Sequence, residues 1–321
     1  MRRRDLIAAS LAAACAPFHL TAQPAAKLHR IGWLDYSSAA ENLGIFVQAM
    51  TALGWQEGKT FRIEYRGGEG RGERLAAVAA ELVRLPADVI VAPGTPEALA
   101  ARKATTAIPI VMAGVDDPVD RGLVASLARP GGNVTGLANA RRELSGKLLS
   151  LLREIFPRAT SVAVLWDSTD PEPRVILGYI QAAAKTLGVT VNAVQVQRYT
   201  EVEPAFAAIK KQGNPMMIVP PSSLLNSKWV ADLALKHGLA LASIAPGYAY
   251  DGGLIAFTDE WHVVFARVAG FVDKILKGAK AADLPVELPT RFKLIINGKT
   301  AHTLGVAIPQ SIMLRADHVV E

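Results

Sequence analysis

Short apolar runs recur along the chain, separated by longer segments in which apolar and polar residues mix. The runs fall at residues 31–34, 61–65, 89–92, 108–113, 134–137, 162–166, 191–196, 216–219, 239–244, 254–257 and 292–296. Many of their residues are β-branched, and their apolarity is continuous rather than alternating. This pattern predicts strands that are covered on both faces, as in parallel sheets.

The segments between these runs have helical periodicity. We predict helices over residues 41–53, 73–85, 96–105, 143–155, 175–187, 202–211, 228–237 and 263–277. In the second of them one helical face is apolar, and it is made of Leu75, Val78, Ala79, Leu82 and Leu85. Regular alternation of strand and helix predicts right-handed βαβ crossovers, and therefore an α/β fold with doubly wound parallel sheets.

The order of these elements occurs twice. The sequence RIGWLDYSS at residues 30–38 is echoed by SVAVLWDST at 161–169, and segment 88–101 is echoed by segment 216–229. Two similar halves predict two Rossmann-like lobes joined by a hinge, with a cleft between them that binds a small molecule. We expect the lobes to be divided as follows: residues 27–140 with about 253–288 in lobe I, and residues 141–252 with about 289–321 in lobe II.

Residues 1–26 are predicted to be a signal peptide for export. Three arginines at 2–4 precede an apolar stretch at 6–16, and a zone of small residues follows, with cleavage predicted after Ala22. The apolar stretch is too short for a permanent membrane span. A loose twin-arginine pattern and ordinary secretion explain the arginines equally well. Both routes predict a periplasmic protein.

Cys15 is the only cysteine of the chain, and it lies within this segment. It ends a degenerate lipoprotein box, LAAAC, so a lipid anchor at Cys15 is an alternative to a freely released protein. Cleavage after Ala22 leaves no cysteine. That outcome excludes disulfides, thiolate catalysis and cysteine-ligated metal sites.

Composition and motifs argue against nucleic-acid binding and against catalysis. The chain has 321 residues, which suits two domains, and its formal net charge of +6 is spread rather than massed. The six histidines lack the HExxH and HxxxH spacings of metal sites, and no GxSxG motif occurs. The glycine-rich segment 67–74 lacks a Walker lysine. We therefore expect no enzyme, no metal, no cofactor and no nucleic-acid partner.

Candidate binding residues lie beyond the carboxyl ends of the predicted strands, where ligands of open parallel sheets bind. The loops at this edge are 35–38, 93–96, 114–120, 167–170, 220–223 and 245–251. Their hydroxyl and N–H groups suit an anion, although Ser and Thr also cap helices without any ligand. Asp117 either binds a ligand ammonium group or caps a turn. Tyr248 either forms an aromatic wall or packs, and Trp261 either faces the cleft or lies at the surface. Trp33 and Trp166 are expected in the core.

Three stretches of the sequence closely resemble a known family. They are Asp117-Pro118, LARPGGNVTG at 127–136 and DKILKGAKAADLPVE at 273–287. With their surroundings they resemble the ABC-transporter substrate-binding family that includes tryptophan- and phenylalanine-type import proteins, over nearly the whole chain after the signal. The resemblance implies a type I periplasmic-binding fold. It also implies a monomer that closes on a small solute and delivers it to an inner-membrane ABC permease, with no reaction.

Positions carried over from the family place ligand contacts on both lobes. These implied contacts are Ser37, Ser38, Thr95 and Asp117 from lobe I, and Ser168, Ser222 and Tyr248 from lobe II. The chain departs from the family near the cleft: Asp116 and Asp120 stand where relatives commonly have glycine, and IAFTDEWHVVF follows Gly253 in place of a Ser-Tyr-Gly-like segment. Because these changes lie near the cleft, the ligand of characterised relatives is not carried over to this chain. We expect a small polar metabolite, such as an amino acid, an aromatic acid or a related carboxylate.

Two alternatives share the predicted fold. A periplasmic sensor would bind a solute in the same way but would report it to a signalling partner. An enzyme such as a racemase or glycosyl transferase would use the same two lobes, although racemases of this shape often need paired cysteines. A cytoplasmic repressor would need an N-terminal DNA-binding helix pair, and a signal sequence occupies that place.

Overall fold

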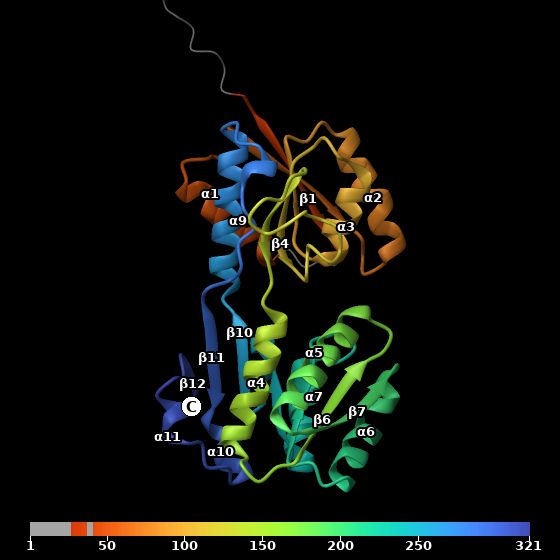
Figure 1. The fold of residues 1–321 in the computed structure, drawn as a ribbon, viewed down its shortest axis with the longest axis vertical. Helices are drawn as coiled ribbons and strands as arrows, with labels where there is room; N and C mark the ends of the chain where they lie inside the picture. The colour runs from red at the N-terminus through yellow and green to blue at the C-terminus, as the bar shows by residue number, and fades with distance from the viewer. Residues whose placement is uncertain (1–26, 37–40) are drawn as a thin grey trace, which may run out of the picture.

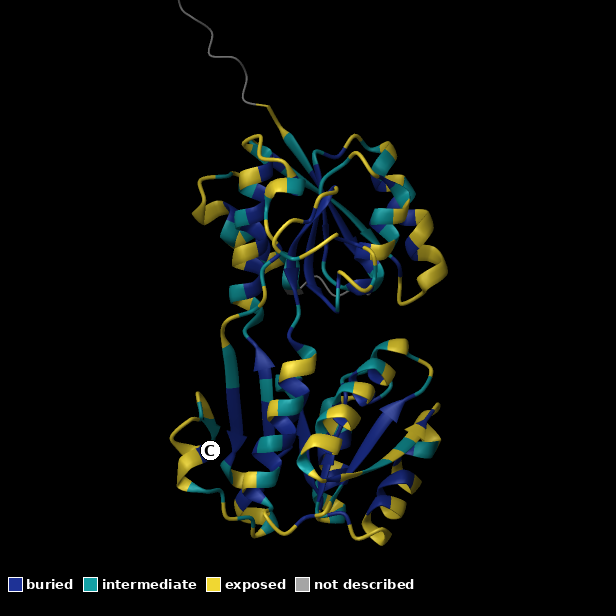
Figure 2. Ribbon diagram, viewed as in Figure 1, coloured by how far each residue is buried: buried dark blue, intermediate teal, exposed yellow. Residues whose placement is uncertain are grey.

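The computed structural model describes residues 27–36 and 41–321. These residues form two α/β lobes, one above the other along the long axis of the molecule (Figure 1). The predicted signal segment, with its cleavage site and Cys15, lies outside the described residues. In both lobes the central strands are almost entirely buried, and exposed residues concentrate on the outer helices and loops (Figure 2).

Lobe I is built on a parallel five-stranded sheet of order β2-β1-β3-β4-β5. Its strands are β1 (His29–Asp35), β2 (Phe61–Gly67), β3 (Val89–Ala92), β4 (Ile110–Val115) and β5 (Val134–Ala138). Helices cover both faces, namely α1 (Glu41–Ala52), α2 (Gly72–Arg84), α3 (Thr95–Ala104) and α9 (Trp261–Leu276) (Figure 1). Alternate residues of each strand serve opposite faces: in β3, Val89 and Val91 pack with the α1–α9 side, and Ile90 and Ala92 pack with the α2–α3 side.

Lobe II is built on a seven-stranded sheet of order β12-β11-β10-β9-β8-β6-β7. Its strands are β6 (Ser161–Asp167), β7 (Thr190–Val196), β8 (Met216–Ile218), β9 (Ala240–Ser243), β10 (Ile255–Asp259), β11 (Phe292–Asn297) and β12 (His318–Val320). The covering helices are α4 (Arg141–Ile155) and α5 (Pro171–Leu187) on one face, and α6 (Tyr199–Lys211) and α7 (Ser227–His237) on the other. Short helices complete the lobe: α8 (Pro246–Tyr250), α10 (Gly298–Leu304) and α11 (Gln310–Met313).

The two-lobed α/β fold predicted from the sequence is confirmed, and the apolar stripe of α2 is buried through Leu75, Val78, Ala79 and Leu82. The expectation of purely parallel sheets is wrong in lobe II, because β11 runs antiparallel to β10. Strand β12 and the three short helices were not predicted. They are short, so their apolar periodicity is weak.

The expected return of the chain to lobe I near residue 253 needs correction. Strand β10 pairs in parallel with β9, so it belongs to the lobe II sheet. After its passage through lobe II, the chain returns to lobe I only at α9, which packs on α1. An apolar run predicts a strand, but its hydrogen-bonding neighbour decides which sheet it joins. Residues 253–259 were therefore assigned to the wrong lobe.

Candidate functional site: a cleft between the lobes

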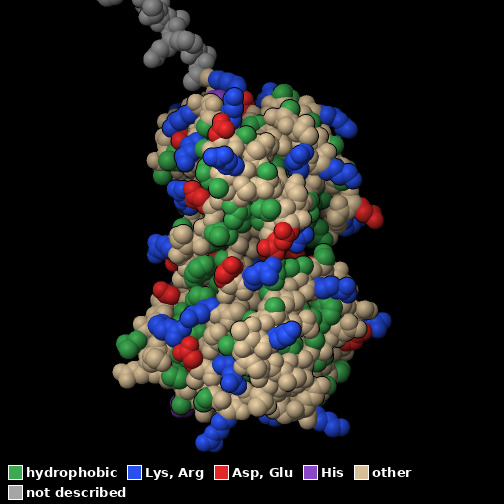
Figure 3. Space-filling model, in the orientation of Figure 1, with side chains coloured by type: hydrophobic (Ala, Val, Ile, Leu, Met, Phe, Trp, Pro, Cys, Tyr) green, Lys and Arg blue, Asp and Glu red, His purple; other side chains and the backbone are tan. Residues whose placement is uncertain are grey.

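A cleft of about 500 Å³ lies between the lobes, at the carboxyl ends of the lobe I strands. Lobe I contributes Asp35, Tyr36, Gly94, Glu97, Gly114 and Trp261 to its wall. Lobe II contributes Arg141 from the first turn of α4, and Asp170 and Glu172 from the start of α5. On the face shown in Figure 3, acidic and basic side chains lie together at the level where the lobes meet. The cleft is thus lined by charged groups from both lobes.

Glu97 is the most deeply buried acid of this wall, with 4% of its surface exposed. One carboxylate oxygen, Oε1, accepts a hydrogen bond of 2.9 Å from the backbone N–H of Tyr36, whereas Oε2 accepts no hydrogen bond from the residues that the structure describes. Burial is the main cause that raises the pKa of Glu97 to about 7; the nearby carboxylates of Asp35 and Glu172 add to it, and backbone hydrogen bonds oppose it. The carboxyl group therefore changes charge near neutral pH.

Gly94 gives the Glu97 carboxyl group its space. Its φ of 152° lies in a region that L-residues rarely adopt, and a Cβ atom there would stand 2.5 Å from Oε2 of Glu97. The predicted loop 93–96 therefore lies at the site. Its contribution is the backbone of Gly94, which lies close to the Glu97 carboxylate, rather than a hydroxyl group.

Arg141 joins two carboxylates at the point where the chain crosses between the lobes. Its Nη1 lies 3.1 Å from Oδ2 of Asp116 in lobe I and 3.1 Å from Oε1 of Glu172 in lobe II. Burial raises the pKa of Asp116 more than the nearby charge of Arg141 lowers it, and the carboxylate of Glu172 raises it as well. This buried cluster fixes the start of α4 against the loop after β4.

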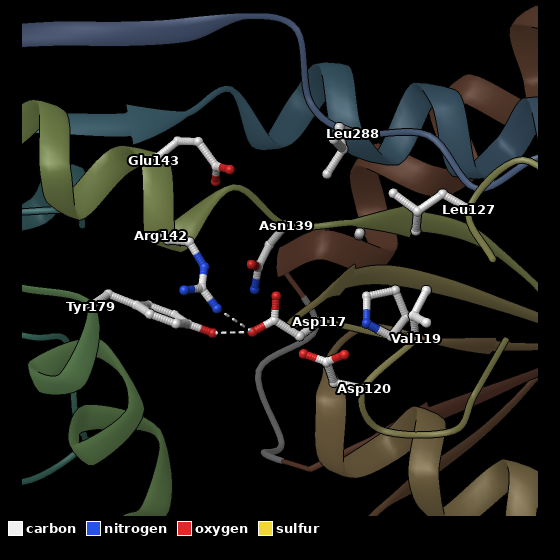
Figure 4. A pocket seen from close by; sticks show the side chains of 11 residues that line it. Asp117, Val119, Asp120, Leu127, Asn139, Arg142, Glu143, Tyr179 and Leu288 are labelled. Carbon is white, nitrogen blue, oxygen red and sulfur yellow. Dashed lines mark hydrogen bonds and ion pairs between the residues drawn. The ribbon is translucent and has the colours of Figure 1, made fainter. Parts of the chain in front are cut away.

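Asp117 connects the lobes on the other side of the crossing, beside a smaller cavity of about 210 Å³ (Figure 4). Its Oδ2 accepts a hydrogen bond of 2.7 Å from the Tyr179 hydroxyl of α5 and lies 3.2 Å from Nη2 of Arg142. The Arg142 guanidinium group also stacks over the Tyr179 ring, 4.7 Å from its centroid. Asp117 reaches these partners from a left-handed backbone conformation, with φ of 42°. It is thus an interlobe contact in this structure.

Replacing Tyr179 with phenylalanine tests the contribution of this contact. Tyr179→Phe removes the hydroxyl donor but keeps the ring under Arg142, so we expect the free energy of unfolding to fall by about 1 kcal/mol. Urea denaturation measures the change. The matched control is Tyr199→Phe, whose exposed hydroxyl makes only a 3.5 Å contact with the Ser223 carbonyl and should be neutral. Equal stability of the two variants would contradict the proposed contribution.

The other described residues that were predicted to contact the ligand make hydrogen bonds within the protein or are buried. Thr95 is buried at the start of α3, where its hydroxyl accepts a hydrogen bond of 3.1 Å from the Asp116 N–H and so ties two cleft loops together. Ser222 accepts a hydrogen bond from the Leu225 N–H. Tyr248 is buried in the lobe II core and donates to the Leu225 carbonyl at 2.6 Å. The hydroxyl of Ser168 is buried without a hydrogen-bond partner.

Ser37 and Ser38 lie outside the described residues. Ser222 and Tyr248 hold lobe II together in this structure and do not line the cleft. Trp33 and Trp166 are buried, as predicted.

Three residues of the cleft were not singled out as binding residues from the sequence: Glu97, Arg141 and Glu172. Arg141 carried a signal, because a cation in the first turn of a helix opposes the helix dipole and so indicates a partner elsewhere in the chain. Trp261, for which two placements were open, lines the cleft with its Cη2 next to the backbone of Gly114.

The family model for ABC transporter substrate-binding proteins matches residues 34–320 of the chain. The chain belongs to this family. The resemblance seen in the sequence is thus confirmed, and the family is one of binding proteins rather than enzymes.

Two similar proteins are described together with an amino-acid ligand. A tyrosine-binding protein of Clostridioides difficile is 26% identical over 264 residues, which are 81% of this chain and 75% of the relative. The solved structure of an ABC domain from Streptococcus pneumonia in complex with L-Trp is 25% identical, with a TM-score of 0.80 over 92% of this chain and all of that chain. The open, ligand-free structure of a Clostridium difficile substrate-binding protein shares the fold at 23% identity, with a TM-score of 0.72 over 91% and 99% of the two chains.

The described residues contain neither a candidate membrane span nor a candidate metal site. Within 27–36 and 41–321 no helix has the length and apolarity needed to cross a bilayer. In the same residues no three histidine, cysteine, aspartate or glutamate side chains are grouped so that they would hold a metal ion.

Proposed function

We propose that this substrate-binding protein captures a small polar solute, such as an amino acid, in the cleft between its lobes and delivers it to the permease of an ABC importer. The observation that carries the proposal is that one cleft is lined by functional groups of both lobes: Glu97 and Trp261 on one side, and Arg141 and Glu172 on the other. A ligand that contacts both sides stabilises the closed arrangement of the lobes more than the open one.

The relatives support the choice of an amino acid. One is named for tyrosine, and another was solved with L-Trp. The cleft volume of about 500 Å³ lies within the range of small-molecule sites, and Trp261 offers an aromatic surface next to the charged wall. Residues such as Thr95 and Asp117 support the cleft from behind or beside it, and Ser168 remains a predicted contact of the ligand-bound form.

The protein acts outside the cytoplasm in this proposal. Substrate-binding proteins of ABC transporters are extracytoplasmic, and the order of charged, apolar and small residues in 1–26 supports export to the periplasm. A monomer suffices, because both sides of the cleft come from one chain.

Ligand-induced stabilisation tests this function. A ligand present at about 100 times its dissociation constant should stabilise the folded protein by about 2.7 kcal/mol. We expect one or more amino acids of a metabolite panel to raise the melting temperature of the wild-type protein, and to raise that of Trp261→Ala less. A panel in which no solute stabilises the wild-type protein, together with turnover of one of its members, would contradict the proposal.

A further inference from the structure

The charges of the cleft wall are strongly unbalanced. Among the described lining residues, Asp35, Glu97, Asp170 and Glu172 are acids, and Arg141 is the single Lys or Arg side chain. Four carboxylates and one guanidinium group give a formal charge of −3 when all are ionised. A wall of this charge attracts cations into the cleft and repels anions.

The cation of the wall is already engaged. Arg141 lies 3.1 Å from a carboxylate oxygen of Asp116 and 3.1 Å from one of Glu172, and its side chain is only 17% exposed. A ligand carboxylate would have to compete with both of these partners. The described part of the cleft wall therefore offers a ligand anion no Lys or Arg side chain that lacks a carboxylate partner.

One carboxylate oxygen of the cleft wall, in contrast to the Arg141 guanidinium group, lacks a partner. Within 27–36 and 41–321, Oε2 of Glu97 has no hydrogen-bond partner, although only 4% of the residue's surface is exposed. A buried acceptor without a partner is costly, and an ammonium group of a ligand is the donor that would satisfy it best. Trp261, in the same wall, can cover the apolar part of such a ligand and attract its positive charge.

We propose that the cleft selects solutes with a net positive charge, that is, organic amines whose charge is not cancelled by a carboxylate of their own, and that Glu97 Oε2 receives the ammonium group. This inference rests on the proposed function and narrows its ligand class. It sets the chain apart from two similar proteins, one named for tyrosine and one solved in complex with L-Trp. Both of these amino acids are zwitterions without net charge at pH 7. The zwitterion brings a carboxylate into a wall that repels it.

Matched compounds that differ only in charge test the inference. We would titrate the full protein by calorimetry at pH 8 with tyramine, L-tyrosine and 3-(4-hydroxyphenyl)propionate, and with pentylamine, L-norleucine and hexanoate. In each scaffold that binds, the cation should bind most tightly and the anion least. Tighter binding of L-tyrosine or L-norleucine than of the matching cation would overturn the inference and leave the proposed function intact. Failure of every compound here and in the metabolite panel would overturn both.

Glu97→Gln shows whether this carboxylate carries the preference. Glutamine can still accept from the Tyr36 N–H but has lost the charge, so we expect affinity for the bound cation to fall roughly 30-fold or more. The matched control is Glu57→Gln, an exposed acid of lobe I that does not line the cleft, and its affinity should equal that of the wild type. Unchanged cation affinity in a folded Glu97→Gln protein would contradict the assigned role.

Discussion

Arg141→Met should lower the free energy of unfolding by about 3 to 5 kcal/mol, the largest loss we expect from a single cleft substitution. The substitution keeps much of the apolar stem but removes the cation between Asp116 and Glu172. The carboxylate of Asp116, with 3% of its side chain exposed, then remains buried without its ion-pair partner, and Arg121 stabilises its charge more weakly than Arg141 does. Urea denaturation at pH 7.5 measures the loss.

Two further variants show that the loss comes from the buried charge. Arg142→Met removes the neighbouring arginine, which is 58% exposed in its contact with Asp117, and should cost no more than about 1 kcal/mol. Asp116→Asn in the Arg141→Met background removes the stranded charge and should restore part of the lost stability. A double variant no more stable than Arg141→Met would show that packing, rather than charge, explains the effect.

Glu97→Gln should stabilise the unliganded protein, and only at higher pH. The pKa of Glu97 is about 7 in the folded protein, against 4.5 for an unperturbed glutamate. Between these values the folded protein holds a proton that the unfolded chain has lost, so the contribution of Glu97 to stability is present below pH 4.5 and is lost as the pH rises through 7. The difference corresponds to about 3 kcal/mol. Glutamine stays neutral and avoids this loss.

The measurement is the free energy of unfolding of the wild type and of Glu97→Gln at pH 4, 6 and 8. The advantage of the variant should be small at pH 4 and should reach about 3 kcal/mol at pH 8. Glu57→Gln serves as the control and should show no such trend, because Glu57 is exposed. An advantage that is equal at pH 4 and pH 8 would contradict an effect of ionisation.

These two results bear on function as well as on stability. The negative charge of Glu97 destabilises the protein without ligand, but the same charge attracts the ammonium group of the proposed ligand. Binding residues that lower stability are common, because a site prepared for a ligand leaves polar groups unsatisfied without it. We therefore expect the bound amine to restore the stability that ionisation of Glu97 removes.

Local patterns predicted the elements of the fold well. The stripe on α2 is buried in the structure, and the strands after which the candidate loops were chosen are present. The placement of β10 was wrong, because an apolar run does not specify its neighbouring strand. Pairing with β9 and β11 depends on residues distant in the sequence.

The candidate site was predicted less completely, for a related reason. Loops 35–38, 93–96, 114–120 and 167–170 contribute to the cleft, whereas loops 220–223 and 245–251 do not line it, and the expectation concentrated on hydroxyl groups. The carboxylate of Glu97 and the cluster of Arg141 with Glu172 become visible only when the lobes meet, since each partner lies on a different element. Their residue types alone are typical of solvent-exposed helix ends.

The distance between the lobes tests the central claim most directly. Spin labels on cysteines introduced at Lys103 of α3 and Gln181 of α5, two exposed positions on different lobes, report this distance by pulsed electron resonance when Cys15 is replaced by serine. Addition of the tightest-binding compound of the matched series should shift the distribution to shorter distances, and Glu97→Gln should need a higher concentration for the same shift. A distance distribution that stays unchanged while calorimetry shows full binding would mean that the solute is not held between the lobes.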